Sequence, residues 1–474
     1  MKVLFVASEV SPYAKSGGLG DVIGSLPKEL KKLGADVRVV FPRYKHLKKT
    51  PDLKYVGSAA ITLDWRRQSA SVFETEENGV NFYLIENDYY FGREGFYGYG
   101  DDHERFAFFS KAAIEILPII NFVPDVIHFH DWQTGVACVY LKDVYKRFKC
   151  FSEVKTLFTI HNLQYQGCFG REVMGSIELN EGYFVNDKLE FYGNISLLKA
   201  GLTYADMLST VSETYALEIQ TPEFGYGLDG MLRSRKDDLH GIVNGIDYDL
   251  YNPETDSTIF KTYSHDDLSG KAINKRELQR TLGLPVRDDV PVVAVVSRLV
   301  DQKGFDILSS CIHDFLARDV QFVVIGVGDG RYEYLFRDLA NRFPDKVSAN
   351  IFFDDNLARQ IYAGSDIFLM PSLFEPCGLG QIIAMRYGTI PVARKTGGLS
   401  DTIEHYNNVT KSGTGFLFEH YMSSGLMWAL SEALSYYNRK EDWNNLIQNA
   451  MRKDFSWHVS AKKYISLYEK LTKK

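Results

Sequence analysis

The chain has 474 residues, a formal net charge of −7, and 45% hydrophobic and 24% charged residues. Because single hydrophobic cores stop growing well below this length, we expect two globular domains. The acidic balance supplies no basic stripe for a phosphate backbone or an anionic lipid surface, so we expect no nucleic-acid and no membrane partner. The longest apolar runs are also far shorter than the roughly 20 residues of a membrane helix.

The five cysteines are scattered along the chain without any C-x-x-C pair. This spacing predicts neither a disulfide framework nor a zinc knuckle, because both need cysteines at characteristic spacings. A reducing, cytoplasmic location fits such a chain best.

The first 41 residues predict one βαβ unit. An apolar strand at 2–5 is followed by a glycine-rich loop at 13–20, a helix with apolar residues every three or four positions, and a second apolar strand at 36–41. The handedness rule for such a unit implies a parallel sheet. Further short apolar strands continue this alternation to about residue 243, at 126–129, 156–160 and 207–211. Residues 1–243 are therefore predicted to form one doubly wound α/β domain.

The same alternation restarts in the second half of the chain. Its apolar strands are expected at 292–296, 322–325, 367–370 and 390–393. Two halves of similar size favour two facing Rossmann-like domains with a deep interdomain cleft, where ligands should bind. Asn244 and Gly245 form a strong turn signal, so we place the second domain at 244–455.

The loop from Lys15 to Asp21 follows a strand and precedes a helix, a position where free N–H groups and the helix dipole favour an anion. Glycines alone could simply make a tight turn, but Lys15 and Asp21 favour a phosphate site. The loop has neither the G-K-[ST] of a Walker A motif nor the G-x-G-x-x-G of a dinucleotide fold. These departures argue against an ATPase and against a nicotinamide-dependent oxidoreductase.

Two segments of the second half carry charge at predicted strand ends. Arg298 and Lys303 follow the strand at 292–296, where a doubly wound sheet binds ligands, so they could clamp a diphosphate. The alternative is two solvated surface cations. Glu375 follows a buried strand, where it could be a helix-start residue and no more, and residues 396–399 end the next strand. The sequence thus places a carboxylate and glycine amides at one sheet edge, where sugar hydroxyls and a phosphate could bind.

Histidines also follow strands in the first half. Alternation places His128 and His130 on one face, which raises the question of a metal site. No third ligand with recognised spacing accompanies them, so we expect no metal. Hydrogen-bonded structural roles suit His128, whereas His161 is a better partner for a sugar hydroxyl.

An aromatic-rich segment lies between Phe82 and Phe109, and the glycines of residues 92–100 predict a loop within it. Aromatic side chains on that loop, such as Tyr97, could stack against sugar faces. Packing into the core is the alternative and the more common fate of aromatic residues.

Several patterns occur in one order along the chain: K-x-G-G-L-G-D, H-x-H-D-W, H-N-x-x-Y-Q-G, V-N-G-I-D, E-P-C-G-L and T-G-G-L-x-D-T. With these motifs the chain resembles the bacterial glycogen synthase and plant starch synthase family over essentially its whole length. The resemblance implies the GT-B architecture, with the first domain on the glucan acceptor side and the second on the nucleotide-sugar donor side. It also implies that the last segment, 456–474, forms a helix that crosses back onto the first domain.

The resemblance further implies roles for residues at matching motif positions. Arg298 and Lys303 would bind the donor diphosphate, with Lys15 joining from the other domain. Glu375 and His161 would hold the glucosyl unit. Phe353 would cover the base. The other implied substrate-binding positions are Gly17, Gly18, Asp21, Asp131, Asn162, Asn244, Cys377, Gly378, Leu379 and Thr396, with Gly397 and Gly398 offering backbone amides to phosphate.

The implied activity is transfer of glucose from ADP-glucose to the non-reducing end of an α-1,4-glucan such as glycogen, with retention of the α configuration and release of ADP. Neither a cofactor nor a metal is expected. One alternative is another retaining GT-B transferase that uses UDP-glucose. Another is a glucan-binding homologue that has lost catalysis, since clefts and aromatic loops can bind without reacting.

Overall fold

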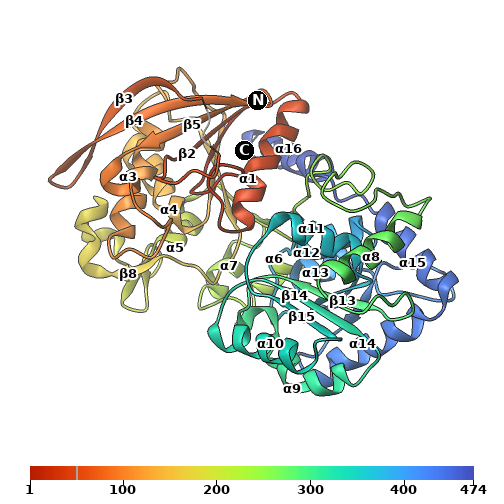
Figure 1. The fold of residues 1–474 in the computed structure, drawn as a ribbon. Coiled ribbons are helices and arrows are strands. Elements are labelled where there is room, and N and C mark those ends of the chain that lie inside the picture. Colours follow the sequence, from red (N-terminus) through yellow and green to blue (C-terminus); the bar gives the residue numbers. More distant parts are fainter. Residues whose placement is uncertain (50–51, 474) are drawn as a thin grey trace. The chain divides into compact units, whose positions relative to one another are not determined.

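The computed structural model describes residues 1–49 and 52–473, and it divides into two compact units (Figure 1). The N-terminal unit comprises Met1–Val211, Ala216–Asn244 and Trp457–Lys474, and the C-terminal unit comprises Ser212–Tyr215 and Gly245–Ser456. Residue 474, the last of the expected C-terminal segment, lies outside the described residues. The acceptor and donor roles of the two domains stay predictions.

The N-terminal unit is built on a nine-stranded sheet in the order β12-β11-β7-β6-β1-β2-β5-β4-β3. Its parallel strands are β1 (Lys2–Val6), β2 (Asp36–Pro42), β5 (Val80–Glu86), β6 (Val126–His130), β7 (Lys155–Ile160), β11 (Met207–Thr210) and β12 (Leu239–Gly241). The predicted βαβ unit is confirmed, because β1 and β2 pair in parallel from Lys2 opposite Asp36. An antiparallel hairpin, β3 (Lys54–Leu63) and β4 (Arg66–Glu77), extends one edge.

Helices cover this sheet, and a small three-stranded sheet accompanies it. The helices are α1 (Gly18–Lys32), α2 (Asp88–Phe91), α3 (Asp102–Glu115), α4 (Trp132–Val139), α5 (Leu197–Tyr204), α7 (Asp229–Ser234) and α16 (Trp457–Lys473). The small sheet has the order β8-β10-β9, from β8 (Cys168–Gly170), β9 (Glu190–Phe191) and β10 (Asn194–Ser196). The C-terminal helix α16 packs against α1.

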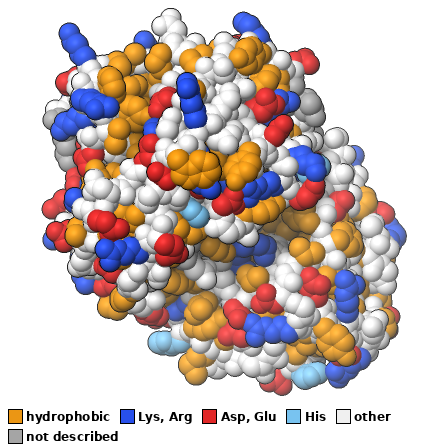
Figure 2. All heavy atoms as spheres, turned by 90° about the vertical axis from the view of Figure 1, so that its left-hand side faces the viewer, with side chains coloured by type: hydrophobic (Ala, Val, Ile, Leu, Met, Phe, Trp, Pro, Cys, Tyr) orange, Lys and Arg blue, Asp and Glu red, His pale blue; other side chains and the backbone are white. Residues whose placement is uncertain are grey.

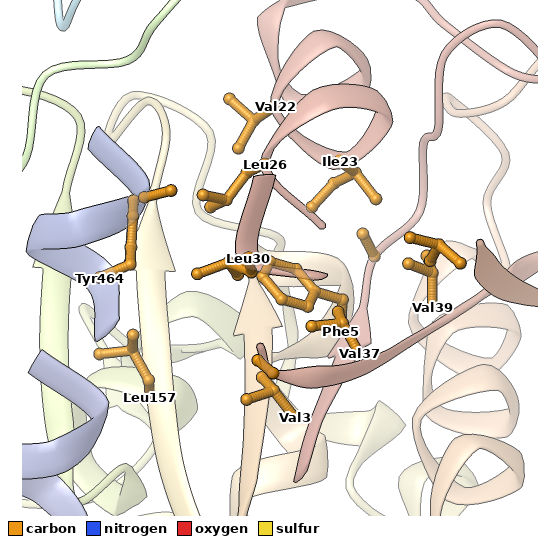
Figure 3. Close-up of a cluster of buried hydrophobic side chains, with 14 of the residues drawn as sticks. Val3, Phe5, Val22, Ile23, Leu26, Leu30, Val37, Val39, Leu157 and Tyr464 are labelled. Carbon is orange, nitrogen blue, oxygen red and sulfur yellow. The ribbon is translucent and has the colours of Figure 1, made fainter. Parts of the chain in front are cut away.

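A buried apolar cluster explains why α16 joins the N-terminal unit (Figure 3). Buried hydrophobic residues recur every three or four positions along one face of α16, and Tyr464, Tyr468 and Leu471 are fully buried there. They share one core with Phe5 of β1 and Leu26 of α1. Burial of this stripe, worth about 25 cal/mol per Å² of apolar surface, holds the last helix on a sheet that the chain formed at its start.

The C-terminal unit contains a six-stranded parallel sheet in the order β15-β14-β13-β16-β17-β18. Its strands are β13 (Val292–Val296), β14 (Gln321–Ile325), β15 (Val347–Asn350), β16 (Ile367–Met370), β17 (Ile390–Arg394) and β18 (Phe416–Phe418). Its helices are α8 (Ser269–Thr281), α9 (Phe305–Leu316), α10 (Gly330–Arg342), α11 (Asp355–Gly364), α12 (Gly380–Arg386), α13 (Gly397–Thr402), α14 (Ser423–Tyr437) and α15 (Lys440–Arg452). The short helix α6 (Glu213–Glu218) begins in this unit and ends in the other.

Both main sheets have a point where the strand order reverses. In the C-terminal unit it lies between β13 and β16, and in the N-terminal unit between β1 and β6. Ligands of open α/β sheets bind beyond the carboxyl ends of strands at such switch points. The loops after these four strands are therefore the places to look for a site.

The described surface carries charges of both signs, and the cysteines form no disulfide among the described residues. Figure 2 shows Lys and Arg side chains interspersed with Asp and Glu on the face in view. No helix in the described part of the chain is long and apolar enough to cross a membrane. The five cysteines are all free in the structure as described.

Candidate active site

The loop after β1 is organised by Glu9, a residue that the sequence motifs did not single out. Its buried carboxylate accepts hydrogen bonds from the backbone N of Ser16 (2.6 Å), the hydroxyl of Ser16 (2.7 Å) and the backbone N of Gly17 (3.1 Å). An internal carboxylate thus already holds two amides of the glycine-rich loop. In this conformation the amide of Gly17 is occupied by Glu9, and the substrate-binding role of Gly17 stays a prediction. The signal in the sequence is a lone acidic residue directly after an apolar strand.

The glycines of this loop are not all required by packing. A Cβ atom added at Gly17 or Gly18 would meet nothing within 4 Å, and neither residue has a positive φ. By contrast, a Cβ at Gly20 would lie 3.0 Å from the Cγ of Lys15. The fold itself therefore does not need glycine at positions 17 and 18. The open space at these two residues would let a ligand come close to the backbone.

Lys15 and Asp21 are brought together at this loop. Their side chains form an ion pair of 2.7 Å, with 29% and 28% of the respective side-chain surface exposed. Asp21 lies in the first turn of α1, where its charge is also favourable for the helix dipole. The pair keeps the ammonium group of Lys15 at the end of β1 while leaving it accessible to solvent.

Tyr97 lies in the irregular segment between α2 and α3, where the sequence predicts a loop. Its hydroxyl hydrogen-bonds with the carboxylate of Glu9 (2.7 Å) and with the hydroxyl of Ser8 (2.8 Å). Desolvation and the charge of Glu9 raise the pKa of Tyr97 well above its usual range, so the phenol stays protonated. The structure places Tyr97 as a support of the glycine-rich loop, and its stacking on a sugar stays a prediction.

Asp131 follows β6 in a strained backbone conformation, with φ of 57° and ψ of −178°. This region is populated almost only by glycine, so other contacts must stabilise it. The carboxylate of Asp131 accepts a hydrogen bond from the backbone N of His161 (2.7 Å), and the backbone N of Asp131 donates to Thr159 (3.0 Å). Burial, reinforced by the charge of Glu9, raises the pKa of Asp131 to about 7.

Three histidines lie in or directly after two strands, His128 and His130 within β6 and His161 after β7. The ring of His128 hydrogen-bonds with the hydroxyls of Tyr468 (2.8 Å) and Thr159 (2.5 Å), which confirms its structural role. His130 and His161 contact each other through ring nitrogens 3.0 Å apart. Burial lowers the pKa of all three, that of His161 to about 3, so they are neutral at physiological pH. Among the residues described, no three His, Cys, Asp or Glu side chains are grouped to hold a metal ion.

Three other predicted residues have different surroundings, and the first of them, Asn162, also hydrogen-bonds with the carboxylate of Asp131 through its backbone. The side chain of Asn162 accepts a hydrogen bond from the backbone N of Gln164 (3.0 Å), as in a local turn. Asn244 is buried, and its side-chain oxygen has no hydrogen-bond partner within the described residues. Phe353 follows β15 in the C-terminal unit with 62% of its surface exposed. Its ring is therefore accessible to a planar ligand.

In the C-terminal unit, Lys303 and Glu375 form a buried ion pair at the switch point. The distance between the ammonium and the carboxylate is 2.6 Å, and only 16% and 6% of the two side chains are exposed. The hydroxyl of Ser372 donates to the same carboxylate oxygen at 3.2 Å. Arg298, on the same loop as Lys303, is exposed, and its guanidinium group has no hydrogen-bond or ion-pair partner in the part of the chain described. One cation is thus fixed in place, and the other is available to an anion.

Close backbone packing brings this pair together. Gly304 has a φ of +78°, and a Cβ there would lie only 1.9 Å from the carbonyl oxygen of Pro371. Only glycine therefore lets the loop after β13 approach the end of β16. This approach places Lys303 beside Glu375.

The glycines after β17 pack against the Glu375 segment. The backbone N of Gly398 donates to the carbonyl oxygen of Glu375 (3.0 Å), and a Cβ at Gly398 would lie 2.1 Å from the carbonyl oxygen of Cys377. The expectation that Gly398 offers its amide to phosphate is therefore corrected, because that amide is occupied. The reason that position 398 must be glycine is tight packing.

The remaining predicted residues lie around the same segment. Gln381 donates from its side chain to the carbonyl oxygens of Cys377 (3.0 Å) and Gly378 (2.9 Å). Gly378 has a φ of +72°, Leu379 caps α12, and Thr396 is buried at the start of α13. The structure thus brings every predicted residue of the 375–398 region to one edge of the sheet, where cations, a carboxylate and backbone groups could bind a sugar phosphate.

Two family models match the chain. The starch synthase catalytic domain matches residues 2–234, and the group 1 glycosyl transferases match residues 282–452. Together they account for both α/β units.

Two curated relatives are similar to this chain over nearly its whole length. A glycogen synthase of Desulforamulus reducens is 50% identical over 99% of this chain and 99% of its own. A glycogen synthase of Geobacillus thermodenitrificans is 49% identical over 100% of this chain and 98% of its own.

The catalytic domain of starch synthase IV from Arabidopsis thaliana, solved with ADP and acarbose, has a TM-score of 0.94 at 35% identity, covering 100% of this chain and 99% of that one. A sucrose-phosphate synthase from Thermosynechococcus elongatus, with a TM-score of 0.64 at 17% identity over 99% of this chain and 98% of that one, shares the fold. The expected GT-B fold class with two Rossmann-like domains is confirmed by these matches. The chain therefore belongs to the glycogen synthase and starch synthase family of glycosyltransferases.

Proposed function

We propose that this chain transfers glucose from ADP-glucose to the non-reducing end of an α-1,4-glucan such as glycogen, with release of ADP. The proposal is supported by the relatives named glycogen synthase and by a similar starch synthase whose structure contains ADP and acarbose. The observation that carries it is the buried Lys303–Glu375 pair beside the unpaired Arg298 at the switch point of a parallel sheet. This arrangement offers positive charge to a diphosphate and a carboxylate to a sugar.

In this proposal Arg298 and Lys303 bind the donor diphosphate and stabilise the negative charge that develops on departing ADP. Lys15 contributes a further positive charge. Glu375 and His161 hold the glucosyl unit, and the exposed ring of Phe353 stacks on adenine. These cations serve the role that a divalent metal has in many other phosphate enzymes, so the reaction is proposed to need no metal and no cofactor.

Transfer is proposed to retain the α configuration by attack on the face from which ADP departs. The 4-hydroxyl oxygen of the acceptor bonds to the anomeric carbon while the bond from that carbon to ADP breaks, its electron pair going to ADP. The departing phosphate oxygen takes the hydroxyl proton. A double displacement would instead need a carboxylate nucleophile. Glu375 is the carboxylate of the candidate site that such a mechanism would use, and it is proposed instead to hold the sugar.

The proposed donor is tested by incubating the purified protein with glycogen and either ADP-glucose or UDP-glucose, and measuring nucleoside diphosphate release. Faster release with ADP-glucose is expected. Equal or faster release with UDP-glucose would support the alternative transferase, and no release with either donor would support a non-catalytic glucan-binding protein.

The proposed stereochemistry is tested by NMR of the new linkage and by intact mass during turnover with a slow donor. An α linkage and an unmodified protein are expected. A β linkage would exclude retention, and a glucosyl adduct on Glu375 would replace front-face attack with double displacement. A cytoplasmic location stays a prediction from the cysteine pattern.

A further inference from the structure

The ring contact between His130 and His161 has a direction that the structure allows us to deduce. Nδ1 of His130 and Nε2 of His161 are 3.0 Å apart, so one nitrogen carries a proton and donates it in a hydrogen bond, and the other accepts that hydrogen bond. A neutral imidazole has a single N–H, and the proton on each ring therefore decides what its second nitrogen can do.

The surroundings of the second ring nitrogen of His130 decide which of its two nitrogens carries the proton. Nε2 of His130 is completely buried and has no hydrogen-bond partner among residues 1–49 and 52–473. If His130 carried its proton there, a buried N–H would lack any acceptor. Buried N–H groups without a partner are rarer than acceptors without a donor. The proton of His130 therefore belongs on Nδ1, where it is donated to Nε2 of His161.

The consequence for His161 follows directly. Because Nε2 of His161 accepts, the single proton of its neutral ring must be on Nδ1. In the described part of the chain, Nδ1 of His161 has no partner, and it is not among the enclosed polar atoms. The atom that His161 presents at the end of β7 is therefore an N–H donor.

We propose that His130 is a positioning residue that fixes the tautomer of His161, so that His161 presents a neutral Nδ1–H donor to the sugar. The tautomer rests on the geometry alone, whereas its use on a sugar rests on the proposed function. A neutral donor can bind a hydroxyl oxygen, but it cannot act as a general base.

The surroundings of His130 hold its ring in the required orientation. Its backbone N donates to the hydroxyl of Thr134 (2.8 Å), and its ring stacks on Phe5 with centroids 5.4 Å apart. The backbone of His161 is held separately by Asp131 (2.7 Å). Burial lowers the pKa of both histidines, which keeps each of them neutral and leaves one proton to be shared in their contact.

The tautomer is tested on the unaltered protein by ¹⁵N NMR of histidine-labelled material, with the His161 signals assigned by their loss in His161→Gln. An unprotonated Nε2 and a protonated Nδ1 of His161 are expected. A protonated Nε2 would overturn the inference and would imply a buried acceptor, such as a water, beside His130.

Three variants test the consequence for activity. His130→Asn keeps a donor near the position of Nδ1, His130→Leu removes it, and His130→Asp supplies only an acceptor, which would reverse the His161 tautomer. We expect kcat to fall less than about 3-fold in the first, about 10-fold in the second and about 100-fold in the third, with ADP affinity unchanged. His313→Asn, an exposed histidine of α9, is the matched control.

Equal kcat losses in His130→Asn and His130→Asp would overturn the positioning role. Absence of glucosyl transfer in the unaltered protein would count against the proposed function. The NMR result would still decide the tautomer in that case.

Discussion

The candidate regions of the two units each contain an ion pair between a lysine and a carboxylate, but the two pairs differ in solvent exposure. In each unit a lysine follows the strand at the switch point and pairs with a carboxylate, Lys15 with Asp21 at 2.7 Å and Lys303 with Glu375 at 2.6 Å. The first pair has 29% and 28% of its side-chain surface exposed, whereas the second has 16% and 6% exposed.

This difference in exposure separates a preformed contact from an adaptable one. Exposed ion pairs contribute roughly 0–1 kcal/mol, so Lys15 can exchange Asp21 for a phosphate at little cost. Breaking a buried pair by removing one partner costs about 3–5 kcal/mol, because the other charge stays desolvated. Lys303 and Glu375 are therefore held in place before any ligand arrives.

The largest effect is expected from Glu375→Ala. It removes the carboxylate proposed to hold the sugar and leaves Lys303 without its partner, so kcat should fall by about 10²–10⁴-fold. The free energy of unfolding should fall too, approaching the cost of an unpaired buried charge. Steady-state kinetics and urea unfolding measure both. Glu375→Gln, which keeps the shape and an acceptor, should lose less stability, and near-normal turnover in Glu375→Ala would remove this residue from the site.

Arg298→Ala and Lys303→Ala separate catalysis from stability. Both should lower kcat/KM by about 10²–10³-fold, because each removes positive charge from the departing diphosphate. Only Lys303→Ala should also lower the free energy of unfolding, since the side chain of Arg298 has no partner among the residues described. Arg337→Ala, an exposed arginine of α10, is the matched control. Equal stability losses in the two variants would contradict the assignment of one fixed and one available cation.

Lys15→Ala tests the adaptable pair. Donor KM should rise by about 10–100-fold through loss of a charge-assisted contact, while the free energy of unfolding changes by less than about 1 kcal/mol. Donor titration and urea unfolding provide the two readings, with Lys32→Ala in the exposed pair with Glu29 as the control. A large loss of stability would show that the exposed pair supports the fold after all.

Asp131→Asn should change how stability depends on pH. The folded-state pKa of Asp131 is raised from 3.8 to about 7, so the folded protein binds more protons than the unfolded chain within that window. The stabilisation that protonated Asp131 gives the folded state is therefore present at low pH and is lost as pH rises through about 7.

Asparagine cannot ionise, so near pH 8 the variant should be more stable than the unaltered protein by on the order of 1–3 kcal/mol, with the gap closing near pH 4. Urea unfolding of both proteins across this range measures the gap. The buried histidines act in the opposite direction in both proteins and cancel in the difference. A gap that does not vary with pH would contradict the raised pKa.

The smallest effect is expected from metal removal. If the lysines of both pairs and Arg298 supply the positive charge, EDTA should leave the rate of ADP release unchanged. Lost activity that a divalent cation restores would show that these side chains are insufficient.

The sequence by itself determined the fold class and indicated most positions of the candidate site. Buried parallel strands are continuous apolar runs, so β1, β2, β6 and β13 can be read directly from the chain. The loops after β1, β7, β13 and β16 carry Lys15, His161, Arg298 and Glu375, at the carboxyl ends of strands where ligands of such sheets bind. The hairpin of β3 and β4 was not foreseen, because its half-exposed strands lack such runs.

Only the tertiary structure decided how these residues are held. Glu9 lies beside the glycine-rich loop because the chain doubles back after β1, and the amide of Gly398 is used by Glu375 because two loops pack tightly. The His130–His161 contact joins two strands that are adjacent in the sheet but 31 residues apart in the sequence. Motifs specify which side chains follow a strand, whereas hydrogen-bond partners and burial depend on long-range packing that local patterns do not contain.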